Sequence, residues 1–169
     1  MTELDIQNCL YREFVKRGHR LIVPNSCVCG WEADLISVTK AGFIHECEIK
    51  ITASDFRADG KKKKFDDITA YASGQRKHRQ QCLRFETTIA QPANFFWYAV
   101  PTGLVTVTDL PGFAGLIYVE DLCRRVEIVK KAPRLHRDKI AERHIEQLTR
   151  NLMIRYWRTR FLKMNRAIE

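Results

Sequence analysis

The sequence lacks the long apolar runs and the glycine and proline repeats that mark several classes of protein. No stretch of the 169 residues approaches the roughly 18 consecutive apolar residues of a transmembrane helix, so we expect no membrane partner. With 8 glycines and 5 prolines, the composition also excludes collagen-like and low-complexity chains. The first residues show no basic-then-apolar signal, and we therefore expect a cytoplasmic protein.

Cysteine is present but not in a metal-binding pattern. The six cysteines include no Cys-x-x-Cys pair, the spacing that many zinc sites use. A cytoplasmic chain of this length builds a core without disulfides, so we interpret the cysteines as free, buried thiols. An iron–sulfur cluster on four dispersed cysteines is the less favoured alternative.

Basic residues outnumber acidic ones, and the excess lies in one part of the chain. The net charge is +9, and residues 124–166 contain 14 Lys or Arg against 4 Asp or Glu. A concentrated positive charge suits a polyanionic partner such as DNA, because basic groups release counterions from phosphates. The alternative is a basic helix face that is simply solvated.

Hydrophobic periodicity predicts one α/β domain with a mixed sheet, in the order helix, three strands, helix, strands, helix. A first helix is expected over 3–17, with Thr2 as its N-cap and Gly18 beyond its end. The expected strands cover residues 20–23, 32–38, 43–51, 94–100, 105–107, 115–119 and 126–129.

The boundaries of several segments follow from local signals. Pro24 and Asn25 are expected to end the first strand, and Thr52 or Ser54 to cap a helix that begins near residue 55. Residues 72–92 are polar and uneven, which indicates mostly loop. A last helix is expected over 138–163, with an apolar stripe formed by Ala141, Ile145, Leu148 and Leu152.

The third expected strand, 43–51, carries charges on one face. Because alternate residues of a strand point the same way, Glu46, Glu48 and Lys50 share that face. A tight turn folds this strand back on the preceding one and places Asp34 beside Glu48. Two carboxylates and an ammonium group are costly to bury without a purpose.

The carboxylates of Asp34 and Glu48 predict a metal site. Carboxylates gathered in this way raise one another's pKa unless a cation lies between them. A hard divalent ion with oxygen ligands, Mg²⁺ or Mn²⁺, is the cofactor we expect. Such an ion lowers the pKa of a bound water, and Lys50 would orient this water or offset charge on a phosphate. The alternative is a surface hairpin with an exposed Glu48–Lys50 pair.

Six segments combine into a recognisable pattern: Glu3-x-Asp5-Ile6-Gln7, Glu32-Ala33-Asp34-Leu35, Glu46-Cys47-Glu48-Ile49-Lys50-Ile51, Ser54-Asp55-Phe56-x-x-Asp59, Phe96-Trp97-Tyr98-Ala99-Val100-Pro101-x-Gly103-Leu104 and Ala114-Gly115-Leu116-Ile117. Together they resemble the PD-(D/E)XK nuclease superfamily, and in particular its MmcB-like branch of DNA-repair and prophage proteins. The resemblance covers residues 2–119 and implies a restriction-endonuclease-like core, in which helices flank a central mixed β-sheet. It also implies metal-dependent hydrolysis of phosphodiester bonds in DNA. Ala33 stands where the superfamily name has proline, a residue that is often absent.

The resemblance implies roles for individual residues. Asp34 and Glu48 would be the metal ligands, with the carbonyl of Ile49 as a third. Lys50 would be the catalytic lysine, and Glu3 matches an acidic residue that many members direct into the site.

Other polar residues near this pattern are weaker candidates. Glu32 and Glu46 are candidate auxiliary ligands. Asp55 and Asp59 are interpreted as charges at the start of their helix, and a direct role in the site is the less favoured alternative. His45 alternates onto the face opposite Glu48 and is expected in the core.

Two basic segments are candidate DNA-binding surfaces. One is the run of lysines formed by Lys61, Lys62, Lys63 and Lys64. The other is the last helix, where Arg155 and Arg158 would contact phosphates and Tyr156 and Trp157 could stack on bases. Solvated lysines and packed aromatic side chains are the alternatives.

These observations predict a nuclease-like domain over 1–130 and a basic helical extension over 131–169 packed on it. The expected function is that of a Mg²⁺- or Mn²⁺-dependent deoxyribonuclease, an endonuclease of DNA repair or phage DNA processing. The alternative is a DNA-binding module of the same fold that does not cut. Related folds often dimerise to cut both strands, which leaves a homodimer open.

Overall fold

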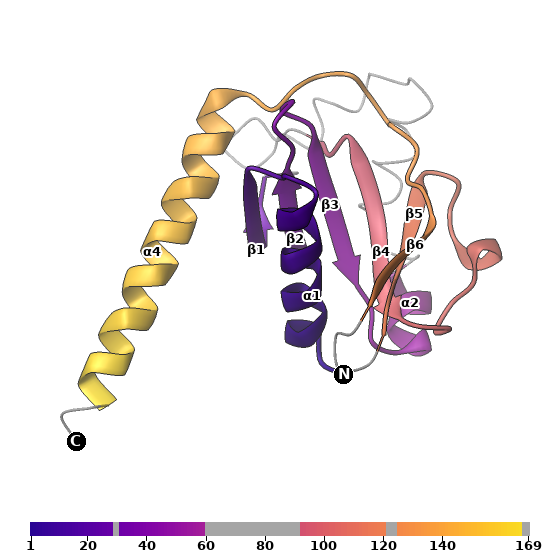
Figure 1. Cartoon of the computed structure of the whole chain (residues 1–169), viewed down its shortest axis with the longest axis horizontal. Helices are drawn as coiled ribbons and strands as arrows, with labels where there is room; N and C mark the ends of the chain where they lie inside the picture. Colours follow the sequence, from indigo (N-terminus) through magenta and orange to yellow (C-terminus); the bar gives the residue numbers. More distant parts are fainter. Residues whose placement is uncertain (29–30, 60–91, 121–124, 167–169) are drawn as a thin grey trace.

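A six-stranded mixed sheet forms the centre of the molecule, and helices flank it (Figure 1). The structure is a computed structural model that describes residues 1–28, 31–59, 92–120 and 125–166, with side chains up to residue 162. The strands follow one another across the sheet in the order β1-β2-β3-β4-β5-β6. The α/β class predicted from the sequence is confirmed, and the architecture is consistent with a restriction-endonuclease-like core.

The first three strands form an antiparallel meander. They are β1 (Leu21–Cys27), β2 (Glu32–Val38) and β3 (Ile44–Ile49). The β2–β3 turn closes through a bond from the Gly42 N–H to the Thr39 carbonyl, 3.0 Å long. The predicted hairpin is therefore confirmed.

The remaining strands place β3 inside the sheet. β4 (Phe95–Pro101) lies parallel to β3, and β5 (Ala114–Val119) lies parallel to β4. β6 (Val126–Lys130) is antiparallel to β5 and forms one edge, while β1 forms the other. β3 thus has neighbours on both sides.

Helix α1 (Glu3–Lys16) covers one face of the sheet. A capping box starts it, since the Thr2 side chain accepts from the Asp5 N–H and the Asp5 carboxylate accepts from the Thr2 N–H. Gly18 follows its end with φ +75°, a conformation that glycine adopts without strain. The buried side chains of this face come from α1 and from alternate strand residues: Ile6, Leu10, Phe14, Leu35, Cys47, Ile49 and Trp97.

The opposite face is covered by α2 (Ala53–Asp59) and by the first part of α4 (Glu142–Arg166). The Thr52 hydroxyl accepts from the Asp55 N–H at the start of α2, which is the cap the sequence predicts. Leu148 of α4 is fully buried against this face. In the part of the chain that the structure describes, no helix has both the length and the apolarity needed to cross a membrane.

The first strand is longer than its sequence predicts. β1 runs through Pro24 and Asn25 to Cys27, so the prediction that these residues end the strand is wrong. An edge strand tolerates proline, because one of its sides needs no backbone hydrogen bonds. Asn25 adopts φ +46°, and asparagine reaches this left-handed region more readily than most residues.

Two further predictions need correction. The expected strand over 105–107 does not form, because Thr106 caps a short 3₁₀ helix at Val107–Asp109. The last helix begins at Glu142 rather than at 138. Before it the chain runs along the sheet, where the Ile140 N–H donates to the Gly42 carbonyl at 2.8 Å. The loop expected over 72–92 lies outside the described residues, apart from its last position.

The cysteines do not all behave alike. Cys47 is a free, fully buried thiol and Cys27 is a free, exposed one. The expectation of free, buried thiols is therefore confirmed for Cys47, wrong for the exposed Cys27, and wrong for Cys9, which is disulfide-bonded. Its bonding partner lies outside the described residues.

Candidate active site

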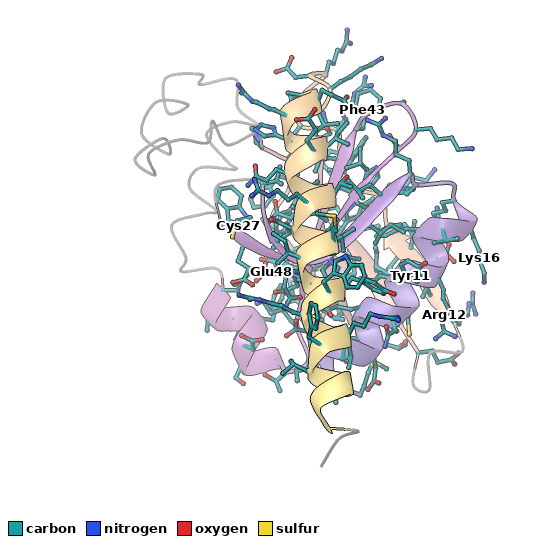
Figure 2. The ribbon with its side chains drawn as sticks, turned by 90° about the vertical axis from the view of Figure 1, so that its left-hand side faces the viewer. Tyr11, Arg12, Lys16, Cys27, Phe43 and Glu48 are labelled. Carbon is teal, nitrogen blue, oxygen red and sulfur yellow. The ribbon has the colours of Figure 1, made fainter. Side chains whose placement is uncertain are left out.

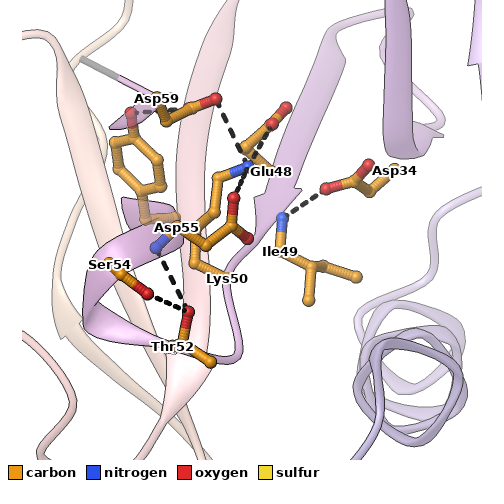
Figure 3. Close-up of polar contacts among 9 residues, drawn as sticks. Asp34, Glu48, Ile49, Lys50, Thr52, Ser54, Asp55 and Asp59 are labelled. Atoms are coloured by element: carbon orange, nitrogen blue, oxygen red, sulfur yellow. Dashed lines mark hydrogen bonds and ion pairs between the residues drawn. The ribbon is translucent and has the colours of Figure 1, made fainter. Parts of the chain in front are cut away.

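The β2–β3 hairpin brings Asp34 and Glu48 together. The strands pair in a register that runs from Val38 opposite Ile44 to Leu35 opposite Cys47. Extended by one pair, this register sets Asp34 opposite Glu48, and opposed residues of an antiparallel pair lie on one face. Figure 3 shows both carboxylates at the end of β3. The juxtaposition predicted from the sequence is therefore confirmed.

The Asp34 carboxylate accepts a backbone hydrogen bond just beyond the last regular β2–β3 pair. Its Oδ2 atom accepts from the backbone N–H of Ile49 at 2.6 Å, beyond the last regular pair. In an extended strand the N–H and C=O of one residue point to the same side, so the Ile49 carbonyl also faces this end of β2. The Asp34 carboxylate and the Ile49 carbonyl thus lie on the same side of β3.

The environment of Asp34 opposes its negative charge. Burial, the neighbouring charge of Glu48 and the more distant charge of Glu3 raise the pKa of the Asp34 carboxyl to about 6. The bond from the Ile49 N–H and the charge of Lys50 act in the other direction without cancelling the rise. A second cation beside Asp34 would stabilise its ionised form.

Glu48 and Lys50 form a buried ion pair. The Lys50 Nζ atom donates to the Glu48 Oε1 atom at 2.7 Å, and both side chains are about 95% buried. Lys50 also lies 3.3 Å from an oxygen of Asp59 and 3.9 Å from one of Asp55. Burial lowers the pKa of the Lys50 ammonium, but its bond to Glu48 and the nearby carboxylates outweigh burial and raise it. Lys50 is therefore fully protonated at neutral pH.

Asp59 has a place that the sequence did not reveal. We interpreted it as a charge at the start of its helix, yet it stands at the end of α2 and is completely buried. One of its oxygens accepts from the Tyr98 hydroxyl at 3.2 Å and the other pairs with Lys50. Burial and the Asp59 charge raise the pKa of Tyr98, so its hydroxyl keeps the proton it donates. Asp59 and Tyr98 together fix the position of the Lys50 ammonium.

Helix α1 contributes to the site from the other side of the sheet. The Gln7 Nε2 atom lies 3.0 Å from Glu3 Oε1, 2.6 Å from Asn25 Oδ1 and 3.0 Å from the Asp34 carbonyl. Gln7 thus joins α1, β1 and β2 next to the metal-ligand candidate Asp34. From the sequence, Gln7 was only part of a family-like segment, and Asn25 was expected only to end its strand. The four-residue spacing of Glu3 and Gln7 was the available signal, because it places both on one helix face.

The two candidate auxiliary ligands, Glu46 and Glu32, differ in burial. Glu46 shares the face of Glu48, is fully buried and accepts from the Trp31 indole N–H at 2.5 Å. Glu32 is exposed at the start of β2. His45 faces away, as expected: it stacks on Trp97 and burial lowers its pKa to about 3.

The predicted DNA-binding residues are only partly described. The lysines Lys61 to Lys64 lie outside the described residues. Arg155 donates from its two terminal nitrogens to the backbone carbonyls of Pro24 and Asn25. The Arg155 guanidinium therefore anchors α4 to β1, whereas the sequence predicted that it contacts DNA phosphates. Arg158 is exposed.

The donor set at the end of β3 suits a hard divalent ion. Asp34, Glu48 and the Ile49 carbonyl offer only oxygen atoms, the ligands that Mg²⁺ and Mn²⁺ prefer. Burial and the charge of Glu48 raise the pKa of Asp34, so a divalent ion bound between the two carboxylates would stabilise their ionised forms. Among the described residues, no group of three or more His, Cys, Asp or Glu side chains is placed to hold a metal ion. Any ion there would depend on two carboxylates and a backbone carbonyl.

Comparison with known proteins adds information on the fold alone. No protein-family model and no curated protein sequence matches the chain. Its structure is similar to that of a Silicibacter pomeroyi protein described as "SPO1766 protein of unknown function", with a TM-score of 0.56 and 19% sequence identity. The match covers 89% of this chain and 82% of that one. The similarity therefore extends through most of both chains.

Proposed function

We propose that this chain is a Mg²⁺- or Mn²⁺-dependent deoxyribonuclease that hydrolyses phosphodiester bonds within DNA strands, acting in DNA repair or phage DNA processing in the cytoplasm. The observation that carries the proposal is the convergence of Asp34, Glu48 and Lys50 at the end of the β2–β3 hairpin. The resemblance of the surrounding segments to PD-(D/E)XK nucleases supports the same chemistry.

Asp34 and Glu48 would hold the ion through their carboxylates, with the Ile49 carbonyl as a third ligand. When bound, a divalent ion supplies positive charge for the phosphate and lowers the pKa of a water molecule. The Ile49 N–H holds the Asp34 carboxylate in orientation through its 2.6 Å bond. Gln7 holds the adjoining backbone of β2 through the Asp34 carbonyl.

Lys50 would act as a cation rather than as a base. Because its pKa is raised, its ammonium keeps the proton at neutral pH and donates hydrogen bonds. It would orient the attacking water and stabilise the negative charge that develops on the phosphate. Asp59 and Tyr98 limit the positions that this ammonium can take.

The direct test combines metal binding with cleavage. Melting temperatures of the wild type and Glu48→Gln are measured with Mn²⁺ and Mg²⁺, beside cleavage of labelled single-stranded, duplex and branched DNA. We expect both ions to stabilise the wild type and not Glu48→Gln, since an ion stabilises only the state that binds it. Glu127→Gln on β6 is the matched control, because its carboxylate is half exposed at the far edge of the sheet.

Cleavage by the wild type and by Glu127→Gln, with none by Glu48→Gln, would support the nuclease. Binding of DNA without cleavage on any substrate and with either ion would refute it. In that case the chain would be a DNA-binding module with a nuclease-like fold.

A further inference from the structure

The second half of α4 leaves the body of the molecule. Its first half is buried at Leu148, whereas the large side chains that follow are between 43% and 64% exposed. They are Met153, Ile154, Tyr156, Trp157, Phe161 and Leu162. We call residues 153–162 the distal segment of α4. Figure 2, which looks onto α4, shows the helix running along this side of the molecule.

Three apolar side chains of the distal segment point away from the core that the first half packs against. Ile154, Trp157 and Phe161 follow the three- and four-residue spacing of one helix face. At about 100° per residue, this face points away from the side on which Leu148 and Leu152 pack. Their exposure therefore follows from helix geometry rather than from local loosening.

Arg155 sets where the distal segment lies. Its guanidinium binds the carbonyls of Pro24 and Asn25, and the Asn25 side chain in turn contacts Gln7 beside Asp34. From this anchor α4 continues in the general direction of β3 but diverges from β1 (Figure 1). The start of the distal segment is thus held at the β1 edge of the sheet, and Asn25 and Gln7 connect this edge to Asp34.

The charge of this part of α4 selects the kind of partner. Residues 147–166 contain six Lys or Arg and no Asp or Glu. A second copy of the helix would bring like charges together, so self-association through this face is disfavoured. A polyanion would gain from the same charges through counterion release.

The aromatic side chains indicate which polyanion fits. The Tyr156 and Trp157 rings meet edge to face at 5.5 Å, and the Trp157 and Phe161 rings are tilted at 6.2 Å. The Arg160 guanidinium lies over the Trp157 ring, 5.9 Å from its centroid. Exposed aromatic rings between arginines form the stacking surfaces that single strands use, because unpaired bases present their faces.

We propose that the distal segment of α4 binds a single-stranded stretch of DNA at the β1 edge of the sheet that carries the candidate active site. The choice of DNA rests on the proposed function, whereas the preference for a single strand rests on the exposed rings. Trp157 stacks on a base, and Arg158 contacts the phosphate backbone. A substrate with a single-stranded portion, such as a flap or a gap, would contact both the active site and α4.

The test measures binding without metal, so that it does not depend on cleavage. Full-length protein in EDTA is titrated with labelled oligothymidine and with a duplex of the same length, in a series of salt concentrations. Trp157→Ala should weaken binding of the single strand about tenfold, the contribution of one stacked base, and leave duplex binding nearly unchanged. Arg158→Glu should weaken both and lower the slope of log K against log salt by about 0.7 on the single strand.

Arg125→Glu serves as the charge control, because Arg125 is exposed beside β6 at the opposite edge of the sheet. It should bind like the wild type. If Trp157→Ala binds the single strand as tightly as the wild type does, the proposal is wrong. It is also wrong if Arg125→Glu loses as much affinity as Arg158→Glu, since charge anywhere would then suffice.

Two further results would replace DNA with another occupant. A wild-type dimer that Trp157→Ala converts to monomer would identify a second copy on this face and overturn the proposal. Binding of a polyglutamate peptide in preference to oligothymidine would identify an acidic protein segment and overturn it too. Failure of cleavage with intact, Trp157-dependent strand binding would refute the nuclease and leave this proposal standing.

Discussion

The two faces of β3 differ in what they bury. Toward α1 the strand presents Cys47 and Ile49, which join an apolar cluster with Leu35 and Trp97. On the other face, Glu46, Glu48 and Lys50 are at least 95% buried. The first face accounts for folding through apolar burial, and the second places charges where they cost free energy.

The cost of the charged face indicates that its residues serve something other than stability. A buried ion pair is often no more stabilising than apolar side chains of the same volume. Apolar residues at 48 and 50 would have extended the core at no such cost. The comparison therefore predicts that changes on the charged face alter activity and that changes on the α1 face alter stability.

The largest effect is expected from removing the Lys50 ammonium. Lys50→Met should lower the rate of DNA cleavage by about a thousandfold, the scale of losing a positioned electrostatic group in an active site. Lys50→Arg is the control, because it keeps a positive charge near Glu48 and Asp59 and should retain part of the rate. Rates are compared at saturating Mn²⁺ on the substrate that the wild type prefers. Equal rates for Lys50→Met and the wild type would remove Lys50 from the mechanism.

The next effect concerns the α1 face. Leu35→Ala removes a side chain that is 98% buried in the cluster beneath α1 and should lower the free energy of unfolding by about 3 kcal/mol. Its folded fraction should cleave DNA at nearly the wild-type rate. Urea unfolding followed by circular dichroism measures the first quantity, and cleavage per folded molecule the second. A large loss of rate in folded Leu35→Ala would contradict the division between the faces.

A smaller effect is expected from changing Asp59, which contributes both to the position of Lys50 and to the stability of the fold. Asp59→Asn keeps the shape and the acceptor for Tyr98 but removes the charge that faces Lys50, so the free energy of unfolding should fall by about 1–3 kcal/mol. Tyr98→Phe keeps that charge and removes only the hydroxyl. If Asp59 positions Lys50, Asp59→Asn should lose more cleavage than Tyr98→Phe at equal stability. The reverse order would assign Asp59 a purely structural role.

The two faces of the sheet at β3 should change the pH dependence of the free energy of unfolding in opposite directions. The pKa of His45 is about 3 in the fold, so below pH 6.5 the unfolded chain binds a proton that the native chain does not. As the pH falls from 6.5 to 3, this difference lowers the free energy of unfolding by about 1.4 kcal/mol for each pH unit. The raised pKa of Asp34 acts the other way, since stability falls as pH rises from 3.8 to about 6.

The two variants His45→Gln and Asp34→Asn resolve these opposing contributions. In metal-free buffer, Asp34→Asn should lose stability more steeply than the wild type as the pH falls from 6 to 4. His45→Gln should change less steeply, or in the opposite direction, across the same interval. Denaturant melts at four pH values between 4 and 7 measure both slopes. Parallel curves for the three proteins would mean that neither group has a shifted pKa.

Much of the site could be predicted because it depends on local pattern. Alternation along β3 placed Glu48 and Lys50 on one face, and the turn before Phe43 brought Asp34 next to them. The contribution of Gln7 could not be predicted with the same ease. Its contacts depend on how α1 packs against β1 and β2, which no local pattern encodes.

The errors arose where tertiary context outweighed local signals. Pro24 normally ends a strand, but here the strand is at the edge of the sheet, where proline is tolerated. Arg155 was predicted to contact DNA phosphates, yet its guanidinium binds two backbone carbonyls of that same edge strand. Both outcomes follow from β1 lacking a strand neighbour on one side.

The sequence by itself determined the α/β class, the hairpin and the pairing of an acidic residue on each of its strands, because strand alternation and tight turns act over a few residues. Only the tertiary structure decided that Asp59, which accepts from Tyr98, pairs with Lys50, and that Arg155 anchors α4 to β1 while the aromatic side chains beyond it stay exposed. These arrangements join residues far apart in the chain, and their positions depend on the packing of whole helices against the sheet.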